Sequence, residues 1–249
     1  MIVYKEAFFD EDQGLLCIVM ELADSGDLKS KIAKAKEMKQ FIKETKIWHI
    51  FKYLLHGVEA LHAANIVHRD IKSANIFLYK DGGVKLGDLN VSAIDSEKVM
   101  QTVTGTPYYC PPEVWRNEPY SSKCDIWSVG CVIYELTALK TPFWAKNIKD
   151  LQIKVKKGDY PPIPEHFSSN LDTLISCCLQ VDPNQRLTAT ELLQHPAFCD
   201  VENIFPFADT IRRARSNDQQ TCLKDSQFID TIVLPNNPTA LNQGLLPEK

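Results

Sequence analysis

The sequence of 249 residues is 44% hydrophobic and 24% charged, which is ordinary for a globular protein of one large domain or two small ones. Its net charge of -4 at pH 7 gives no reason to expect nucleic acid or an anionic membrane as a partner. No apolar run is long enough for a membrane span, and the first residues lack the features of a signal peptide.

The predicted elements begin with two strands, over residues 3–9 and 15–20, which are apolar or aromatic and are separated by a polar loop. A turn follows, in which Asp27 is placed to cap a helix over residues 29–38. Residues 43–64 carry apolar side chains at helical spacing and predict a long amphipathic helix.

Two short strands, over residues 76–79 and 84–86, are predicted next, with a turn between them. The remaining periodic segments predict helices over residues 125–139, 148–157, 171–179 and 188–193, the first of them strongly apolar and buried. After residue 198 the sequence becomes polar and loses its periodicity, so we expect residues 199–249 to be extended or disordered.

The eight cysteines could indicate a disulfide framework. None forms a C-x-x-C pair, and Cys177 and Cys178 are adjacent, which is a poor geometry for a bond between them. We therefore predict reduced thiols in a cytoplasmic protein, with Cys131 among the core residues.

The polar residues that follow the long helix supply groups for chemistry. Asp70 and Lys72 are two residues apart, so their side chains leave the same face of an extended segment. A carboxylate beside an ammonium suits group transfer, in which Asp70 orients a hydroxyl and Lys72 balances phosphate charge. Asn75 and Asp88 are hard oxygen donors of the kind that Mg²⁺ prefers. The alternative is a solvated loop with scattered charges, but it does not account for this ordered set.

The run HRDIKSAN at residues 68–75 resembles the protein-kinase catalytic loop H-R-D-x-K-x-x-N, and GDLN at residues 87–90 stands in the place of D-F-G. Leu89 keeps the apolar character of the Phe in D-F-G, and the aspartate of the motif is retained as Asp88. The resemblance implies that Asp70 is the catalytic base and that Lys72 contacts the γ-phosphate of ATP. It also implies that Asn75 and Asp88 are Mg²⁺ ligands.

Residues 102–113, TVTGTPYYCPPE, resemble the end of a kinase activation segment. The family geometry would pair Glu113 with Arg186 in a buried bidentate salt bridge. It would also have Asp125 accept backbone N–H groups of the catalytic loop. Lys72 together with Thr106 implies specificity for Ser and Thr rather than Tyr. Structural roles are implied for His68, Arg69, Glu113, Asp125 and Arg186.

Arg69 beside the catalytic aspartate suggests control by phosphorylation, because a phosphate on the activation segment would neutralise its charge and order the loop. Our hypothesis is that Thr102 is the main phosphosite and Thr104 the second choice. The alternative is that both are simply exposed loop threonines.

The second strand resembles the last strand of a kinase N-lobe followed by the hinge. Met20 would be the gatekeeper, backbone groups of Glu21 and Ala23 would bind adenine, and Phe77 would form the apolar floor beneath it. Taken alone, an apolar strand is more often core than ligand site, and only its position before the catalytic loop favours the functional interpretation.

Together these motifs are most similar to those of the NimA-related (NEK) Ser/Thr kinases over roughly residues 2–198. The resemblance implies an α+β, protein-kinase-like fold with a mainly helical C-lobe. Residues 1–20 would be a remnant of the N-lobe sheet, and residues 21–198 the hinge and C-lobe. It also implies ATP, Mg²⁺ and protein substrates, and a location in the cytoplasm, at the centrosome or in the cilium; no feature indicates an oligomeric state.

The glycine-rich loop and the strand lysine that hold ATP in kinases do not occur before Met20. Residues 32–34, Ile-Ala-Lys, superficially match V-A-I-K, but they follow the hinge in a lysine-rich stretch that we interpret as a solvated helix face. We therefore expect a truncated sequence whose first strands expose apolar edges and which alone binds ATP weakly and turns over poorly.

Two classes of function fit these features. The first is a NEK-like Ser/Thr kinase, and the second is a pseudokinase without an N-lobe that acts as a scaffold. A scaffold has no chemical need for the whole set of Asp70, Lys72, Asn75 and Asp88, so their retention favours the enzyme.

Overall fold

The computed structural model describes residues 1–11, 13–88, 107–119 and 121–198. Its elements are β1 (Tyr4–Asp10), β2 (Leu15–Met20), α1 (Leu28–Glu37), α2 (Glu44–Ala63), the 3-10 helix η1 (Ser73–Asn75), β3 (Ile76–Leu78), β4 (Val84–Leu86), α3 (Pro112–Trp115), α4 (Lys123–Ala138), α5 (Ile148–Lys157), α6 (Ser169–Cys178) and α7 (Ala189–Leu193). The predicted α+β class is confirmed. Within the described ranges, no helix has the length and apolar character that a membrane crossing needs.

The first two strands form an antiparallel hairpin, in which Phe9 lies opposite Leu16 and Ala7 lies opposite Ile18. Among the described residues this sheet has no third strand. Its large side chains are accordingly exposed, with Phe9 at 59% and Leu16 at 67%, as expected for apolar strands without sheet neighbours. The chain before the hairpin joins the rest of the fold through the N–H of Ile2, which donates to the carbonyl of Leu86 at 2.8 Å.

The first helix begins at the predicted cap. The Oδ1 atom of Asp27 accepts the backbone N–H of Ser30 at 2.8 Å, and its Oδ2 atom accepts the Ser30 hydroxyl at 2.8 Å. The backbone of Asp27 also pairs with Phe77 in an isolated β-bridge. The cap therefore fixes the start of α1 beside the short sheet of β3 and β4.

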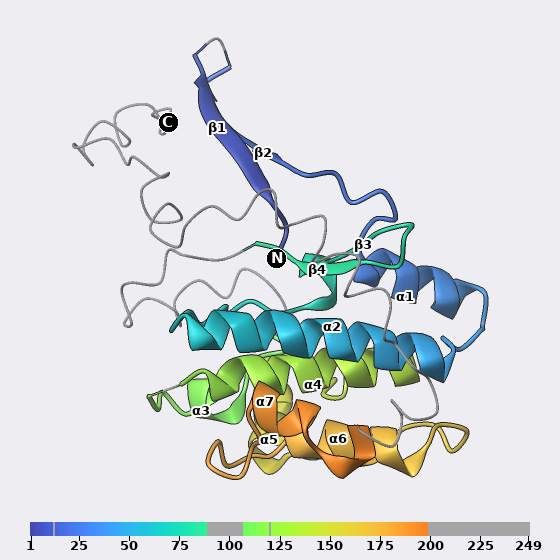
Figure 1. Cartoon of the computed structure of the whole chain (residues 1–249). Helices are drawn as coiled ribbons and strands as arrows, with labels where there is room; N and C mark the ends of the chain where they lie inside the picture. Colours follow the sequence, from blue (N-terminus) through green and yellow to red (C-terminus); the bar gives the residue numbers. More distant parts are fainter. Residues whose placement is uncertain (12, 89–106, 120, 199–249) are drawn as a thin grey trace. The chain divides into compact units, whose positions relative to one another are not determined.

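The core forms around α2 and α4, which lie against each other, with β4 and α7 also packed on α2 (Figure 1). The apolar stripe predicted for α2 is buried, and it comprises Ile47, Ile50, Phe51, Leu54, Leu55, Val58 and Leu61. Helix α4 is buried along almost its whole length, including Cys131, because α6 covers it on another side. Both helix predictions, and the burial of Cys131, are confirmed.

Helices α4 and α6 approach closely at Gly130. A methyl group at this position would lie 2.6 Å from Cβ of Cys178 and 3.0 Å from Cδ2 of Leu179. We expect Gly130→Ala to destabilise the fold by about 1–3 kcal/mol, measured by urea unfolding. Gly57→Ala in α2 is the matched control, because, apart from its chain neighbours and the adjacent backbone of α2, no atom lies within 4 Å of its added methyl group. It should instead stabilise the helix by roughly 0.5–1 kcal/mol, and equal effects at both positions would contradict the packing argument.

Candidate active site

A buried carboxylate on α4 holds the backbone of the loop over residues 68–75, which resembles a kinase catalytic loop. Asp125 is 1% exposed, and its oxygens accept the N–H groups of His68 and Arg69, each at 2.8 Å. The Nε2 atom of His62 lies 2.9 Å from the same carboxylate. Arg69 has a φ of 67°, a left-handed conformation that costs energy for a residue with a side chain. The two hydrogen bonds from Asp125 stabilise this turn and so direct the residue that follows it, Asp70.

Asp70 lies at the centre of a polar group formed by the loop itself. Nζ of Lys72 donates to its Oδ2 atom at 2.7 Å, and Nδ2 of Asn75 donates to the same oxygen at 3.0 Å. Nδ2 of Asn75 also donates to the Asp70 carbonyl at 2.9 Å. No donor in the described ranges contacts Oδ1, and the side chain is 32% exposed, so this oxygen is available to a hydroxyl from solution.

A chain of hydrogen bonds places Asp88 beside this group. The carbonyl of Gly87 accepts from Nε2 of His68 at 2.9 Å, and the N–H of Gly87 donates to the carbonyl of Asn75 at 2.9 Å. A Cβ atom at Gly87 would lie 2.6 Å from the ring of Phe77, so the chain passes close to the short sheet here. Asp88 follows with an exposed side chain and a φ of 56°. Its carboxylate therefore directly follows a residue whose N–H and carbonyl are both hydrogen-bonded.

His68 is fully buried, and its hydrogen bonds indicate the neutral ring. Nε2 carries the proton donated to Gly87, while Nδ1 accepts the N–H of Asp70 at 3.4 Å. Burial lowers the pKa of His68 below its ordinary value of 6.5, and the carboxylate of Asp125 opposes this only in part. Protonation of Nδ1 would remove the acceptor for Asp70, so the neutral ring supports the loop.

This environment predicts a pH dependence of stability. The pKa of His68 is lower in the folded chain than in the unfolded one. The neutral ring therefore contributes fully to the free energy of unfolding above about pH 6.5, and this contribution is lost as the pH falls through the pKa of the folded state. Urea unfolding at about pH 7.5 and about pH 5.5 should show that the free energy of unfolding falls more between the two pH values for the wild type than for His68→Gln. An NMR titration midpoint of the His68 ring at or above 6.5 would contradict the prediction.

The residues predicted to contact adenine lie around the end of the hairpin. Met20 ends β2 with 40% exposure, and Phe77 is the central residue of β3, opposite Lys85. The Glu21 carboxylate accepts Nζ of Lys85 with both oxygens at 2.9 Å and the N–H of Val3 at 2.8 Å. Burial raises the pKa of Glu21, but Lys85 and Val3 more than offset this, so the net shift is downward. The side chain thus ties the hinge to β4.

The carbonyl of Ala23, the other predicted hinge residue, accepts the N–H of Gly26 at 3.2 Å within the turn before α1. The proposed phosphosites Thr102 and Thr104 lie outside the described residues, as do Thr106, Leu89 and Asn90.

Glu113 and Arg186 form the bidentate pair that the motif implies. Nη1 of Arg186 donates to Oε1 of Glu113 at 2.8 Å and Nη2 donates to Oε2 at 3.1 Å, with both side chains buried. The remaining N–H groups of Arg186 donate to the carbonyls of Lys123 and Gln180 at 2.7–3.2 Å. All five donors of the guanidinium are therefore used, which is the condition for burying a charge.

A second polar contact between the loop and α4 was not predicted from the sequence. The Ser73 hydroxyl lies 3.0 Å from the Tyr109 hydroxyl, which donates to Oε2 of Glu135 at 2.7 Å. Burial raises the pKa of Glu135. The signal is present in the sequence, because Glu135 is the one charged residue in the mostly apolar run over residues 126–139. This contact joins the loop over residues 68–75, the segment that carries Tyr109 and the core.

Residues 1–198 match the family model described as protein kinase domain. Serine/threonine-protein kinase Nek3 of Mus musculus is 44% identical over 195 residues, which are 78% of this chain and 37% of the relative. Nek5 of the same species is 43% identical over 189 residues, covering 75% of this chain and 30% of the relative. Nek1 of Mus musculus is 39% identical over 247 residues, covering 98% of this chain and 20% of the relative. The chain therefore spans well under half the length of these relatives.

Proposed function

The chain belongs to the protein kinase domain family, and on this premise we propose that it transfers the γ-phosphate of ATP to Ser and Thr hydroxyls of proteins, as a NEK-like kinase. The observation that supports this most directly is the Asp70 carboxylate, whose Oδ2 is held by Lys72 and Asn75 while its Oδ1 contacts no donor among the described residues. A protein that served only as a scaffold would need none of this geometry.

In the proposed reaction, Oδ1 of Asp70 accepts the proton of the substrate hydroxyl as its oxygen attacks the γ-phosphorus. The new O–P bond forms while the bond from the γ-phosphorus to the bridging oxygen breaks, and ADP leaves with that electron pair. The side chain of Lys72 is 38% exposed, and its Nζ lies beside Asp70, where it can balance the charge of the transferring group.

We also propose that Asn75 and Asp88 hold Mg²⁺. The donor atoms of these two residues suit Mg²⁺. Nδ2 of Asn75 donates to Asp70, so the amide oxygen of Asn75 remains as the ligand atom, and Asp88 offers an exposed carboxylate. In the described ranges no group of three or more His, Cys, Asp or Glu side chains gathers to hold a metal, so phosphate and water would complete the coordination. Bound there, Mg²⁺ would neutralise phosphate charge.

The proposal extends to the remaining predicted sites. Backbone groups of Glu21 and Ala23 would bind adenine beside Met20, with Phe77 beneath it. Phosphorylation of Thr102, or secondarily Thr104, would place a dianion against Arg69 and order the activation segment. The described cysteines are free thiols, which supports a cytoplasmic location, and the NEK resemblance supports the centrosome or cilium.

The test is transfer of labelled γ-phosphate to peptides that carry Ser, Thr or Tyr. The chain would be assayed alone and joined before Met1 to the glycine-rich lobe that holds ATP in protein kinases. We expect slow transfer by the chain alone and faster transfer by the joined chain, with the label on Ser and Thr. If the joined chain folds but transfers no phosphate above background, the kinase proposal is wrong and the scaffold is favoured.

A further inference from the structure

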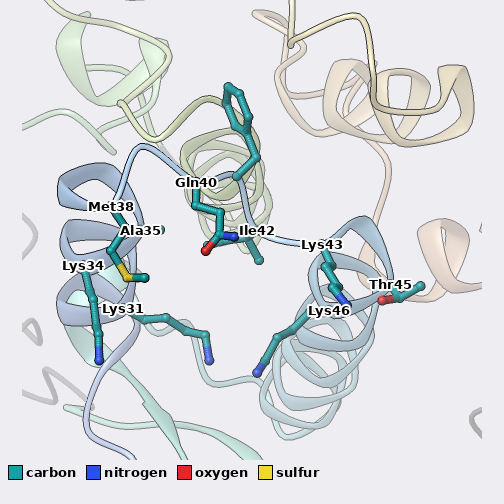
Figure 2. Close-up of a pocket in the computed structure, with 10 residues that line it drawn as sticks. Lys31, Lys34, Ala35, Met38, Gln40, Ile42, Lys43, Thr45 and Lys46 are labelled. Carbon is teal, nitrogen blue, oxygen red and sulfur yellow. The ribbon is translucent and has the colours of Figure 1, made fainter.

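A pocket away from the catalytic loop lies between α1 and the start of α2. It is an open depression with a volume of about 340 Å³. The side chains around it come from both helices and from the segment that joins them (Figure 2). Those used below are Lys31, Lys34, Met38, Ile42, Lys43 and Lys46.

The charge around this pocket is strongly positive in a chain that is acidic overall. Residues 29–46 contain seven lysines and two glutamates, against a net charge of -4 for all 249 residues. The carboxylate of Glu44 is engaged elsewhere, since it accepts the N–H and hydroxyl of Ser168 and Nε1 of Trp48. No carboxylate of the described chain is ion-paired with the four lysines of the pocket. The positive charge is therefore not neutralised from within this part of the molecule.

Two of the lysines converge instead of spreading into solvent. Figure 2 shows the ammonium groups of Lys31 and Lys46 directed toward each other across the pocket, from α1 and α2 respectively. Lys31 is half-buried, and burial together with the neighbouring ammonium of Lys46 lowers its pKa to about 8. Most Lys31 side chains still carry a charge at pH 7, so two like charges face each other. Such a pair is unfavourable unless an anion lies between them.

The rest of the lining limits the kind of anion. Ile42 is buried at 8% exposure, and Met38 adds an apolar side chain at the rim. Lys34 and Lys43 also line the pocket, but Figure 2 shows their ammonium groups turned away from the space between Lys31 and Lys46, so the set that faces an anion is the pair Lys31 and Lys46. An anion with several oxygens and nearly two negative charges fits this set better than a single carboxylate does, and a phosphate monoester carries about −1.5 to −2 at neutral pH.

We propose that this pocket binds a phosphoryl group, with Lys31 and Lys46 as the principal ligands and the apolar side chains beside them in contact with the group that bears the phosphate. The phosphate belongs either to a phosphorylated side chain of a protein or to a free phosphate monoester. Binding here does not depend on phosphoryl transfer at Asp70, so the pocket can be tested apart from the proposed function.

The experiment measures binding to the whole chain by isothermal titration calorimetry. The probes are a short peptide with one phosphoserine between leucines, the same peptide unphosphorylated, and inorganic phosphate. The variant Lys31→Gln/Lys46→Gln should weaken phosphopeptide binding by about tenfold or more, because it removes two charge-assisted hydrogen bonds. The control Lys36→Gln/Lys39→Gln changes the net charge equally, on exposed lysines that do not line the pocket, and should change binding by less than about twofold.

A second variant guards against loss of folding. Lys46→Glu places a carboxylate opposite Lys31, so it should raise the melting temperature slightly and abolish phosphate binding together. Binding of the phosphopeptide alone would assign the pocket to a phosphorylated side chain, and equal binding of inorganic phosphate would assign it to a free monoester. Equal binding of the unphosphorylated peptide, or equal weakening by the control variant, would overturn the proposal.

Discussion

Asp70→Asn should lower the rate of phosphoryl transfer by about 10²–10⁴-fold, the range that a positioned general base contributes. The substitution keeps the shape of the side chain, so its contacts to Lys72 and Asn75 have near-equivalents, but the amide cannot accept the substrate proton. The measurement is the rate of γ-phosphate transfer by the joined chain at saturating ATP. The melting temperature should stay close to that of the wild type, because the Asp70 side chain is one-third exposed.

Asp159→Asn is the control for this experiment, since it makes the same chemical change at an exposed position after α5. It should leave the rate unchanged. A transfer rate that survives Asp70→Asn within about tenfold would show that another group takes the proton, and the role proposed for Asp70 would be wrong.

Arg186→Met should destabilise the fold by about 3–5 kcal/mol, because it leaves the Glu113 carboxylate buried without its partner. The carbonyls of Lys123 and Gln180 lose their donors as well. Urea unfolding at pH 7 measures the free energy, with the midpoint reported against that of the wild type. The effect is large because burial of the pair has already cost both charges their hydration.

Two further variants make this prediction specific. Arg116→Met breaks a partly exposed pair with Glu118 at 3.7 Å and should cost less than about 1 kcal/mol. The double variant Arg186→Met/Glu113→Leu should be more stable than Arg186→Met alone, because it removes the unpaired carboxylate. A double variant less stable than the single one would indicate that packing, and not the buried charge, dominates.

The sequence predicted the long elements well because their signals are physical and local. Helix α2 has an apolar stripe over several turns, and α1 has a cap at Asp27. Helix α3 and the 3-10 helix η1 were missed, because elements of four and three residues are too short to show periodicity. Their conformations depend on contacts with distant residues, such as Arg186 for Glu113 in α3.

At the candidate site, the motif predicts which residues take part but not how they are held. Proximity of Asp70 and Lys72 followed from their spacing, whereas the contact from Tyr109 to Glu135 joins residues 26 apart and needs the fold. The sequence predicts a solvated helix face for residues 32–34. Ala33 and Lys34 are exposed, but Ile32 is buried. The neighbouring Lys31 turns inward toward α2, and only the packing of the two helices shows this.

Because Asp125 accepts the N–H groups of His68 and Arg69, the shape of the loop over residues 68–75 depends on the interior of the molecule. The carboxylate belongs to the first turn of α4, and α4 is fixed by α2 on one side and α6 on another. A substitution that shifts α4 by a fraction of an ångström would thus displace the backbone of His68 and Arg69 and rotate Asp70 away from its partners. Genetic screens for inactive alleles should for that reason recover conservative changes deep in the helical lobe, at positions that no substrate ever reaches.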